Sequence, residues 1–455
     1  MLLTSEAISS KSIKPQTGLT FWGLNLCIQK GAILMNFILS QPTLCDVIGR
    51  KNISLDDALS LAKTYAPSTP NPEQISLSDS KGRVLSVPLM ASHAVPPFAN
   101  AAMDGYALAH RDLEYAPTGL PLGPVILAGS KPQKLQSGTA CPITTGAPMP
   151  LGADVVIEQE RCSVRSGHMF LNTSTSDKPH VRAAGEDVEK DQELAPAGTI
   201  MTPRLAALAS ATGLNKIEVL KPLRIALIST GDEIVGPGQP LPAGKIHDSV
   251  RMFLSSELQR QNIQLMDLGV QSDRPQPVIE TLYSAVSSAD LVLTTGGASV
   301  GRADPIRAAL NATGATELFH GVKMRPGKPL GLHYLDGVPI VTLPGNPYAA
   351  IVGYYFVVRA MIETSFGASI FGSRQIEAKL SADFMRRREV LEFVPVTLDA
   401  GRLDACPVAT IIARGSSSRL SPVVAADGLA LLGGGGTMLP VGSKVPVLEF
   451  SSVAC

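Results

Sequence analysis

The sequence has no excess of charge and few charged or aromatic residues. Lysine and arginine total 39, and aspartate and glutamate total 39, among 455 residues, so the net charge is zero. Binding to nucleic acid or to an anionic membrane through overall charge needs a basic excess, and we therefore expect neither partner. Hydrophobic residues make up 45% of the chain and charged residues 17%, which excludes a disordered protein.

Paired cysteines and metal-ligand spacings are also missing. The six cysteines include no C-x-x-C pair, and none has a histidine at the spacing of a zinc site. A chain of this length can bury a large core and needs no disulfide framework. We interpret the cysteines as reduced thiols of a cytoplasmic protein.

No hydrophobic run is long enough to cross a membrane. The longest, residues 349–358, has about half of the roughly 20 residues that a membrane helix needs. Near the amino terminus an apolar segment is interrupted by Asn25, Gln29 and Lys30, and no signal-peptide cleavage site follows it. We interpret residues 1–52 as an N-terminal extension. Either translation starts at Met35, or the residues before it form a disordered tail.

The chain changes in character near residue 222. Residues 54–66 have the spacing of an amphipathic helix with Ser54 as its N-cap, and short strands broken by glycine and proline follow up to about residue 200. Strands then alternate with helices, which predicts βαβ units on a parallel sheet. The strands are expected at 223–229, 263–270, 289–295 and 337–345, and the helices at 249–261, 275–288, 303–313 and 347–362. After about Gly367 short strands return and predict a small β domain.

A glycine-rich stretch, GGASVGRAD, follows one of the predicted strands. Gly296, Gly297 and Gly301 allow the backbone to approach an anion closely, although the spacing is neither that of a Walker motif nor that of a Rossmann fingerprint. A tight strand-to-helix turn would explain the glycines, and Asp304 could then be a helix cap. An acid beside phosphate-binding glycines more often brings a magnesium ion.

Further charged loops follow other strands. STGDEIV places Asp232 and Glu233 at a strand end, where acids are typically catalytic or metal-binding. Asp273 ends another strand, although SDRP is also a good helix start. MRPGKPLG presents Arg325 and Lys328 on a turn stiffened by two prolines, which favours an oxyanion clamp over a solvated turn.

The β-rich half adds three weaker motifs. NAAMDGYAL contains Asp104, but its D-G pair could equally form a hairpin turn. TTGAP contains Thr145, and AAGEDV contains Glu186 and Asp187. Acids together with phosphate-binding loops favour a magnesium-dependent reaction on a phosphorylated or oxyanionic small molecule.

At these loops the sequence resembles the molybdopterin molybdenumtransferase family, which includes the carboxy-terminal domain of gephyrin. The matching stretches occur in the family's order over about residues 53–450. They are PPFANAAMDGYAL, ITTGAPMPLGADVVIEQE, AAGEDV, ISTGDEIV, TTGGASVGRAD, MRPGKP and LPGNPYAA. The resemblance implies insertion of molybdate into adenylylated molybdopterin, with Mg²⁺ as cofactor and release of AMP. It also implies a cytoplasmic homodimer whose active site combines two subunits, and it leaves open contact with other enzymes of molybdenum cofactor synthesis.

The resemblance further implies a multidomain fold of α/β and β parts. After the extension it predicts a helix at 53–70 that packs on the α/β domain, and an elongated β-rich domain at 71–95 and 190–220. An inserted β domain spans 96–189, the parallel-sheet α/β domain that binds molybdopterin spans 221–367, and a β-barrel-like domain spans 368–455.

Site residues are carried over from the family position by position. The implied catalytic residues are Asp104, Thr145, Asp187, Glu233, Asp273 and Asp304. The implied substrate-binding residues are Gly296, Gly297, Ser299, Arg325, Lys328, Pro344 and Asn346. Magnesium would be held by Asp304 and Glu233, and Asp104 would come from the partner subunit.

The sequence departs from the family at three positions. Arg325 stands where lysine is usual, which keeps the charge and adds bidentate reach. Gly321 stands where some members have lysine, with Lys323 nearby as a substitute, and Ala102 replaces a common serine. Two other functions stay open: a molybdopterin adenylyltransferase, which would not need the long β half, and a non-catalytic molybdopterin-binding scaffold.

Overall fold

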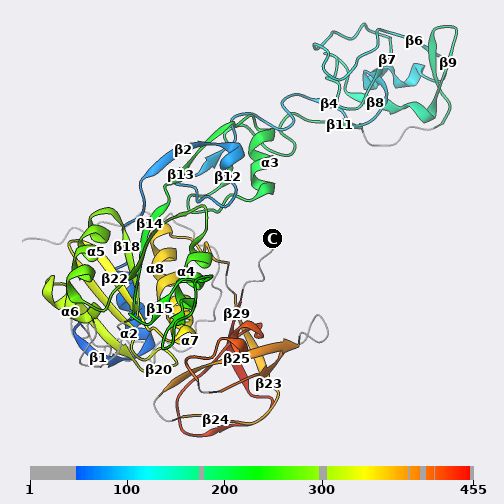
Figure 1. The fold of residues 1–455 in the computed structure, drawn as a ribbon. Helices are drawn as coiled ribbons and strands as arrows, with labels where there is room; N and C mark the ends of the chain where they lie inside the picture. Colours follow the sequence, from blue (N-terminus) through cyan, green and yellow to red (C-terminus); the bar gives the residue numbers. More distant parts are fainter. Residues whose placement is uncertain are drawn as a thin grey trace, which may run out of the picture. The chain divides into compact units, whose positions relative to one another are not determined.

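The computed structural model describes residues 48–173, 179–296, 305–372, 374–387, 390–399, 406–414 and 416–450. Outside these ranges lie the alternative start, Met35, and three of the predicted site residues, Gly297, Ser299 and Asp304. The described residues form an α/β part, a β-rich N-terminal half and a closed C-terminal β sheet (Figure 1). These parts confirm the predicted fold class.

A seven-stranded sheet lies at the centre of the α/β part. Its strands are ordered β1-β19-β21-β22-β18-β14-β17, and every neighbouring pair is parallel except the two made by β21. Their bounds are β1 Arg50–Ile53, β14 Leu223–Thr230, β17 Ile263–Gln271, β18 Leu291–Thr295, β19 Thr316–Val322, β21 Gly331–Leu335 and β22 Val338–Leu343. Parallel strands covered on both faces are continuously apolar, which is why β14 and β18 were recognisable in the sequence.

Helices cover both faces of this sheet. In Figure 1, α5 and α6 lie on one side of it and α4 and α8 on the other. The bounds are α2 Leu55–Thr64, α4 Ser249–Leu258, α5 Pro275–Ser288, α6 Pro305–Ala312, α7 Pro347–Gly353, the π-helix η5 Tyr354–Val358 and α8 Arg359–Phe366. Helices α5 and α6 share one hydrophobic core with β14, β18 and β22, while α2 packs against α8. The N-cap prediction is confirmed, because Ser54 Oγ accepts a hydrogen bond of 3.1 Å from Asp57 N.

The proposed extension of residues 1–52 is too long at its carboxyl end. Residues Arg50–Ile53 form β1, the edge strand of the seven-stranded sheet, paired in parallel with β19. Only Ile53 of this strand is buried. Because only one of its four residues is buried, this strand has no alternation of apolar and polar residues, and the sequence pattern gave no signal for it.

Helices α7, η5 and α8 form one continuous run, Pro347–Phe366. Within the described ranges, this run alone is long and apolar enough to cross a membrane, but 72% of its most apolar window is buried inside the protein. Tyr354, near its middle, is fully buried. The apolar character of the run is therefore explained by its place in the protein core.

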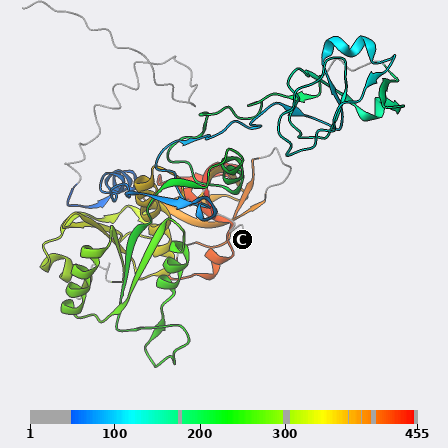
Figure 2. The same cartoon turned by 90° about the horizontal axis from the view of Figure 1, so that it is seen from above.

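The β-rich half contains two groups of short strands, which Figure 2 shows from above. In the first, strands from before and after residues 96–189 pair with one another: β2 Pro72–Ser76 with β13 Lys216–Leu220, and β3 Leu89–Met90 with β12 Glu193–Ala195. Helix α3, Pro203–Ala211, and the 3₁₀ helix η2, Leu77–Asp79, accompany them. This pairing requires the chain to leave this group and to return to it.

The second group consists of two three-stranded sheets, β7-β5-β8 and β6-β10-β9, and the pair β4–β11. The bounds are β4 Asn100–Ala101, β5 Gly105–Leu108, β6 Leu120–Pro121, β7 Cys141–Ile143, β8 Val155–Glu158, β9 Cys162–Arg165, β10 His168–Leu171 and β11 Val181–Arg182, with 3₁₀ helices η3 His110–Tyr115 and η4 Gln159–Arg161. Strand β4 pairs with β11, and β5 pairs with β7 and β8. The D-G hairpin considered for Asp104 is therefore wrong, because the segments on either side of it pair with different partners.

The C-terminal sheet closes on itself. Its order is β20-β25-β26-β23-β29-β27, and β25 also pairs with β27. The bounds are β20 Met324–Arg325, β23 Gln375–Leu380, β25 Leu391–Asp399, β26 Val408–Ile411, β27 Gly428–Leu432 and β29 Lys444–Glu449, beside the pair β24 Phe384–Met385 and β28 Met438–Leu439 and the short helix α9 Ser421–Val424. Strand β20 belongs to the predicted basic loop MRPGKPLG at residues 324–331, the cation loop, so this loop connects the α/β part with the C-terminal sheet.

Candidate functional site

The loops at the carboxyl ends of β14, β18 and β22 pack tightly together. Gly296 has a φ of 83°, and a Cβ at this position would collide with the backbone oxygen of Thr230 and lie 2.8 Å from Thr230 Oγ1. A Cβ on Gly345 would lie 3.5 Å from the Cα of Gly296. Glycine is thus required at 296 by both conformation and space, and the TTGG and LPGNP loops are direct neighbours.

Two carboxylates bind each other's backbone beside these loops. Asp232 N donates to Asp273 Oδ2, and Asp273 N donates to Asp232 Oδ1, each at 3.2 Å. The N-cap of α5 is Arg274, so Asp273 does not cap that helix. Both side chains are exposed, as is the neighbouring Glu233. The structure therefore gathers three carboxylates at the ends of β14 and β17.

The cation loop lines a cleft of about 500 Å³ together with the C-terminal sheet. From the loop and its flanks come the exposed side chains Lys323, Arg325 and Lys328, and from the C-terminal part comes Arg414. Pro344 and Asn346 of the LPGNP loop, together with Ser416 and Ser417, are also in the wall. The cleft thus brings together four of the predicted substrate-binding residues, Arg325, Lys328, Pro344 and Asn346, and its electrostatic character is basic.

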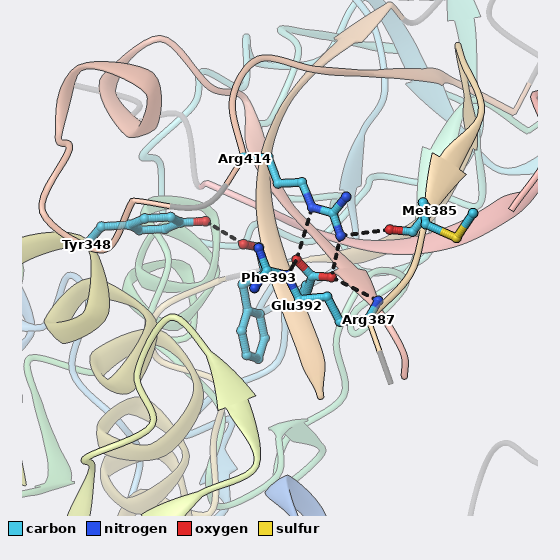
Figure 3. Close-up of polar contacts among 6 residues, drawn as sticks. All are labelled: Tyr348, Met385, Arg387, Glu392, Phe393 and Arg414. Carbon is cyan, nitrogen blue, oxygen red and sulfur yellow. Dashed lines mark hydrogen bonds and ion pairs between the residues drawn. The ribbon is translucent and has the colours of Figure 1, made fainter. Parts of the chain in front are cut away.

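The acidic member of this wall, Glu392, is buried and compensated (Figure 3). Its carboxylate accepts hydrogen bonds from Arg414 Nη2 at 2.8 Å and Arg414 Nε at 3.3 Å, and it lies 3.1 Å from Arg387 Nε. Arg414 Nη2 also donates to the backbone oxygen of Met385 at 2.7 Å. Two arginines surround one carboxylate, so Glu392 orients Arg414 and leaves the cleft with a positive balance.

A tyrosine joins the wall of the cleft to the helix behind it. Tyr348 of α7 donates a 2.7 Å hydrogen bond to the backbone oxygen of Phe393 in β25 (Figure 3). Burial raises the pKa of the Tyr348 hydroxyl, which keeps it protonated and able to donate. Sequence reasoning missed Tyr348, Glu392 and Arg414 as parts of the site. No motif surrounds the two charged residues, while Tyr348 stands beside LPGNP within the matched stretch LPGNPYAA.

The departure at Gly321 has a structural basis. Gly321 has a φ of 89°, and a Cβ there would lie 2.9 Å from Asn52 Oδ1. A lysine at this position would be strained by the positive φ, and the Asn52 side chain would have to move. Lys323, whose backbone N donates to the Ile53 oxygen at 2.8 Å, lies in the wall of the cleft instead.

The remaining predicted residues lie in the second group of β-strands. Asp104 Oδ1 accepts hydrogen bonds from Thr145 N at 2.6 Å and from Thr145 Oγ1 at 2.9 Å. These two bonds lower the pKa of Asp104, so its exposed carboxylate stays ionised at neutral pH. Asp187 is exposed, and its backbone N donates to the Val95 oxygen. The structure brings Asp104 and Thr145 together.

Thiol chemistry finds no support in the described cysteines. Cys141, Cys162 and Cys406 are free. Burial, with a smaller effect of Glu158, raises the pKa of Cys162 to about 11, and burial also raises the pKa of Cys141. Both therefore remain protonated and weakly nucleophilic at neutral pH.

Three family models match consecutive parts of the chain. They are described as "MoeA N-terminal region (domain I and II)" at residues 53–213, "Probable molybdopterin binding domain" at 226–364 and "MoeA C-terminal region (domain IV)" at 377–450. Among curated relatives, a molybdopterin molybdenumtransferase of Haemophilus influenzae is 32% identical over 311 residues, which cover 68% of this chain and 77% of the relative. The one of Bacillus subtilis is 30% identical over 389 residues, covering 83% and 89%.

Solved structures agree with this similarity. A molybdopterin biosynthesis MoeA protein from Pyrococcus horikosii superposes with a TM-score of 0.78 and 28% identity, covering 88% of this chain and all of its own. A second structure from Pyrococcus horikoshii OT3 has a TM-score of 0.72 and 25% identity over the same 88% of this chain. The likeness thus extends over all three parts of the fold.

Proposed function

The chain belongs to the MoeA family of molybdopterin molybdenumtransferases, and we propose that it inserts molybdate into adenylylated molybdopterin and releases AMP. The observation that carries this proposal is the basic cleft between the cation loop and the C-terminal sheet. The reaction that we propose is a group transfer in molybdenum cofactor synthesis, and both of its substrates, molybdate and adenylylated molybdopterin, are anions.

The cleft has the chemistry of an oxyanion site. Molybdate is a dianion, and an anion bound in the cleft would lie among Lys323, Arg325 and Lys328, whose exposed charged groups are accessible to it. Pro326 and Pro329, which are also in the wall, limit the freedom of the loop, so little entropy is lost when it binds. Arg414 is already held by Glu392 and can serve as a fixed donor.

The loop after β14, which carries Asp232 and Glu233, suits a magnesium ion that is also bound by a phosphate of the substrate. Within the described part of the chain no group of three or more His, Cys, Asp or Glu side chains could hold a metal by itself. Mg²⁺ is usually bound by one or two carboxylates, with water and phosphate oxygens in its other positions. We assign it to Glu233 and to Asp304, which lies outside the described residues. When bound there, the ion would neutralise charge on the pyrophosphate of the substrate.

The residues of the second β group complete the proposal. Thr145 holds Asp104 ionised and in one orientation. Such a preorganised carboxylate suits positioning of a substrate or of a hydrated ion. We propose that Asp104, Thr145 and Asp187 act in the active site of a partner subunit in a homodimer.

One assay separates this function from its alternatives. The purified protein should release AMP from adenylylated molybdopterin only when molybdate is added. An adenylyltransferase would instead consume ATP to make that substrate, and a scaffold would release no AMP. A variant with Lys328→Ala should lose molybdate-dependent release, while Lys444→Ala, whose ammonium pairs with Glu377 away from the cleft, should keep it. Molybdate-independent release would refute the proposal.

A further inference from the structure

The first turn of α7 contacts both walls of the basic cleft. One wall is the cation loop, and the other is formed by β25 and by Arg414 with the serines that follow it. Tyr348 and Ala349 of α7 belong to the lining of the cleft, and both are buried, with 5% and 2% of their surfaces exposed. A buried turn in this place can transmit the position of one wall to the other.

On the side of the cation loop, α7 limits the space around Gly327. Gly327 has a φ of 108°, and a Cβ at this position would lie 2.6 Å from Met324 Cε and 3.6 Å from the backbone oxygen of Ala349. The turn of the loop thus lies against Met324 and the first turn of α7. Because Gly327 stands between Arg325 and Lys328 in the sequence, the position of α7 limits where both cations can lie.

On the side of the C-terminal sheet, Tyr348 makes two hydrogen bonds. Its hydroxyl donates to the Phe393 oxygen at 2.7 Å, and its backbone N donates to the Ser417 oxygen at 3.1 Å. Phe393 follows Glu392, whose carboxylate holds Arg414. Tyr348 and Arg414 thus approach the start of β25 from two sides (Figure 3). The Tyr348 hydroxyl is therefore bonded to the strand that orients Arg414.

The two walls are also joined directly. Strand β20 of the cation loop pairs in parallel with β25, and this pairing places Arg325 in register with Glu392. Beside it, Leu391 N donates to the Lys323 oxygen at 3.2 Å. Because β20 has only two residues, the pairing is short, and further contacts are needed to hold the walls at one distance. The two hydrogen bonds of Tyr348 are contacts of that kind.

We propose that Tyr348 is a positioning residue that fixes the width of the basic cleft, so that Arg414 and the cations of the loop reach one bound oxyanion together. This inference rests on the proposed function of the cleft. The hydroxyl acts through Phe393 and the strand that carries Glu392, and it needs no contact with the anion. Hydrogen bonds weaken steeply with distance and angle, so a displaced wall should weaken the binding of a small dianion.

The decisive variant is Tyr348→Phe, which removes the hydroxyl and keeps the ring. The rings of Phe393 and Phe356 lie with their centres 4.5 Å apart, so β25 stays attached to the helix run and the variant should fold. Tyr354→Phe is the matched control, because Tyr354 is buried on the same run but its hydroxyl donates to Glu257 at 3.3 Å. We expect Tyr348→Phe to raise the molybdate Kd about fivefold, the size expected from one hydrogen bond, and Tyr354→Phe to leave it unchanged. Equal affinities of the wild-type protein and Tyr348→Phe would overturn the inference.

A double-variant cycle separates positioning from a general structural effect. Arg414→Gln removes the charge but keeps an amide that can donate to Glu392. If Tyr348 acts by placing Arg414, adding Tyr348→Phe to Arg414→Gln should change the molybdate Kd by less than about twofold. A further loss of about fivefold would show that the hydroxyl does not act through Arg414, which contradicts the assignment.

Amide hydrogen exchange tests the junction of the walls without any ligand. Tyr348→Phe should speed exchange in segments 346–350 and 390–396, which contain the amides of residue 348 and of Leu391, whereas Tyr354→Phe should not. If the wild-type protein binds no molybdate, the proposed function fails, and this readout still decides whether Tyr348 holds the walls together. Unchanged exchange in both segments would overturn the inference.

Discussion

At the scale of single residues, one buried carboxylate, that of Glu392, fixes the orientation of two arginine side chains beside the cleft. Glu392 is 3% exposed and binds Arg414 and Arg387, which orients both guanidinium groups. Lys323, Arg325 and Lys328 are exposed instead. The site therefore combines a fixed arginine with cations that an arriving anion can attract.

Replacement of Arg325 should weaken oxyanion binding. We expect Arg325→Ala to weaken molybdate binding, because a cation is removed from the cleft wall. The loss of binding free energy is about 1.5–3 kcal/mol for a charge-assisted contact. Arg325→Lys, the usual family residue, should lose little. Isothermal titration at fixed magnesium and salt measures both variants. Wild-type affinity in the alanine variant would show that this turn is only structural.

The buried histidine beneath the cation loop should make stability sensitive to acid. Burial lowers the pKa of His320 below its ordinary value of 6.5, while Glu317 on its own strand opposes this shift and Arg307, His333 and Lys51 add to it. Below pH 6.5 the unfolded chain gains a proton that the folded chain does not, so the free energy of unfolding falls as the pH decreases further.

His320→Gln should remove this part of the pH dependence. Urea unfolding between pH 7.5 and 5 would show a shallower decline than in the wild-type protein. His110→Gln, at an exposed position, should keep the wild-type slope. An unchanged slope in His320→Gln would exclude His320 as the titrating group.

At the scale of elements, the contact between the ends of β14 and β18 depends on a glycine. We expect Gly296→Ala to destabilise the protein by about 1–3 kcal/mol, because a positive φ and a collision with Thr230 act together. Gly433→Ala is the control, since a Cβ there meets no atom within 4 Å and the backbone is not left-handed. Differential scanning calorimetry compares the two. Equal melting temperatures would mean that the loop relaxes at no cost.

The elements that the sequence predicted are those with a strong periodic or continuous apolar signal. Strands β14, β17, β18 and β22 and the helices α2, α4, α5 and α6 fall where hydrophobic spacing placed them. Strands β1 and β20 gave no such signal, because each is short and lies at a sheet edge, with Ile53 the only buried residue of β1 and Met324 the only buried residue of β20. The antiparallel strand β21, which follows the cation loop, was not predicted. It has only five residues, and periodicity alone cannot assign so short an apolar run.

The site was predictable only where its residues stand in compact loops. Arg325, Lys328 and Asn346 lie in motifs whose glycines and prolines mark functional turns, and the structure gathers them in one cleft. Arg414 and Glu392 are 22 residues apart in the sequence, and the antiparallel pairing of β25 with β26, the strand that precedes Arg414, brings them together. Such pairings depend on tertiary contacts that no local pattern encodes.

At the scale of the whole molecule, the proposed site residues within the described ranges fall into two groups. Asp104 and Thr145 bind each other in the second β group, while Lys328 lies in the cleft formed by the cation loop and the C-terminal sheet. If both groups act on one substrate, the simplest arrangement that unites them is a second copy of the chain, as closed two-fold symmetry is the commonest form of oligomer.

Mixed dimers test this arrangement directly. Asp104→Ala and Lys328→Ala should each be inactive as homodimers, because every active site then lacks one group. In a heterodimer of the two variants one of the two sites has both residues intact, so molybdate-dependent AMP release should return to about half of the wild-type rate per dimer. Differently tagged subunits, coexpressed and purified through both tags, provide verified heterodimers. The double variant paired with wild type is the control, and it should be inactive if each complete site needs one residue from each chain, because both of its sites then lack a group. Activity in this control together with none in the heterodimer of single variants would show that each site is built within one chain.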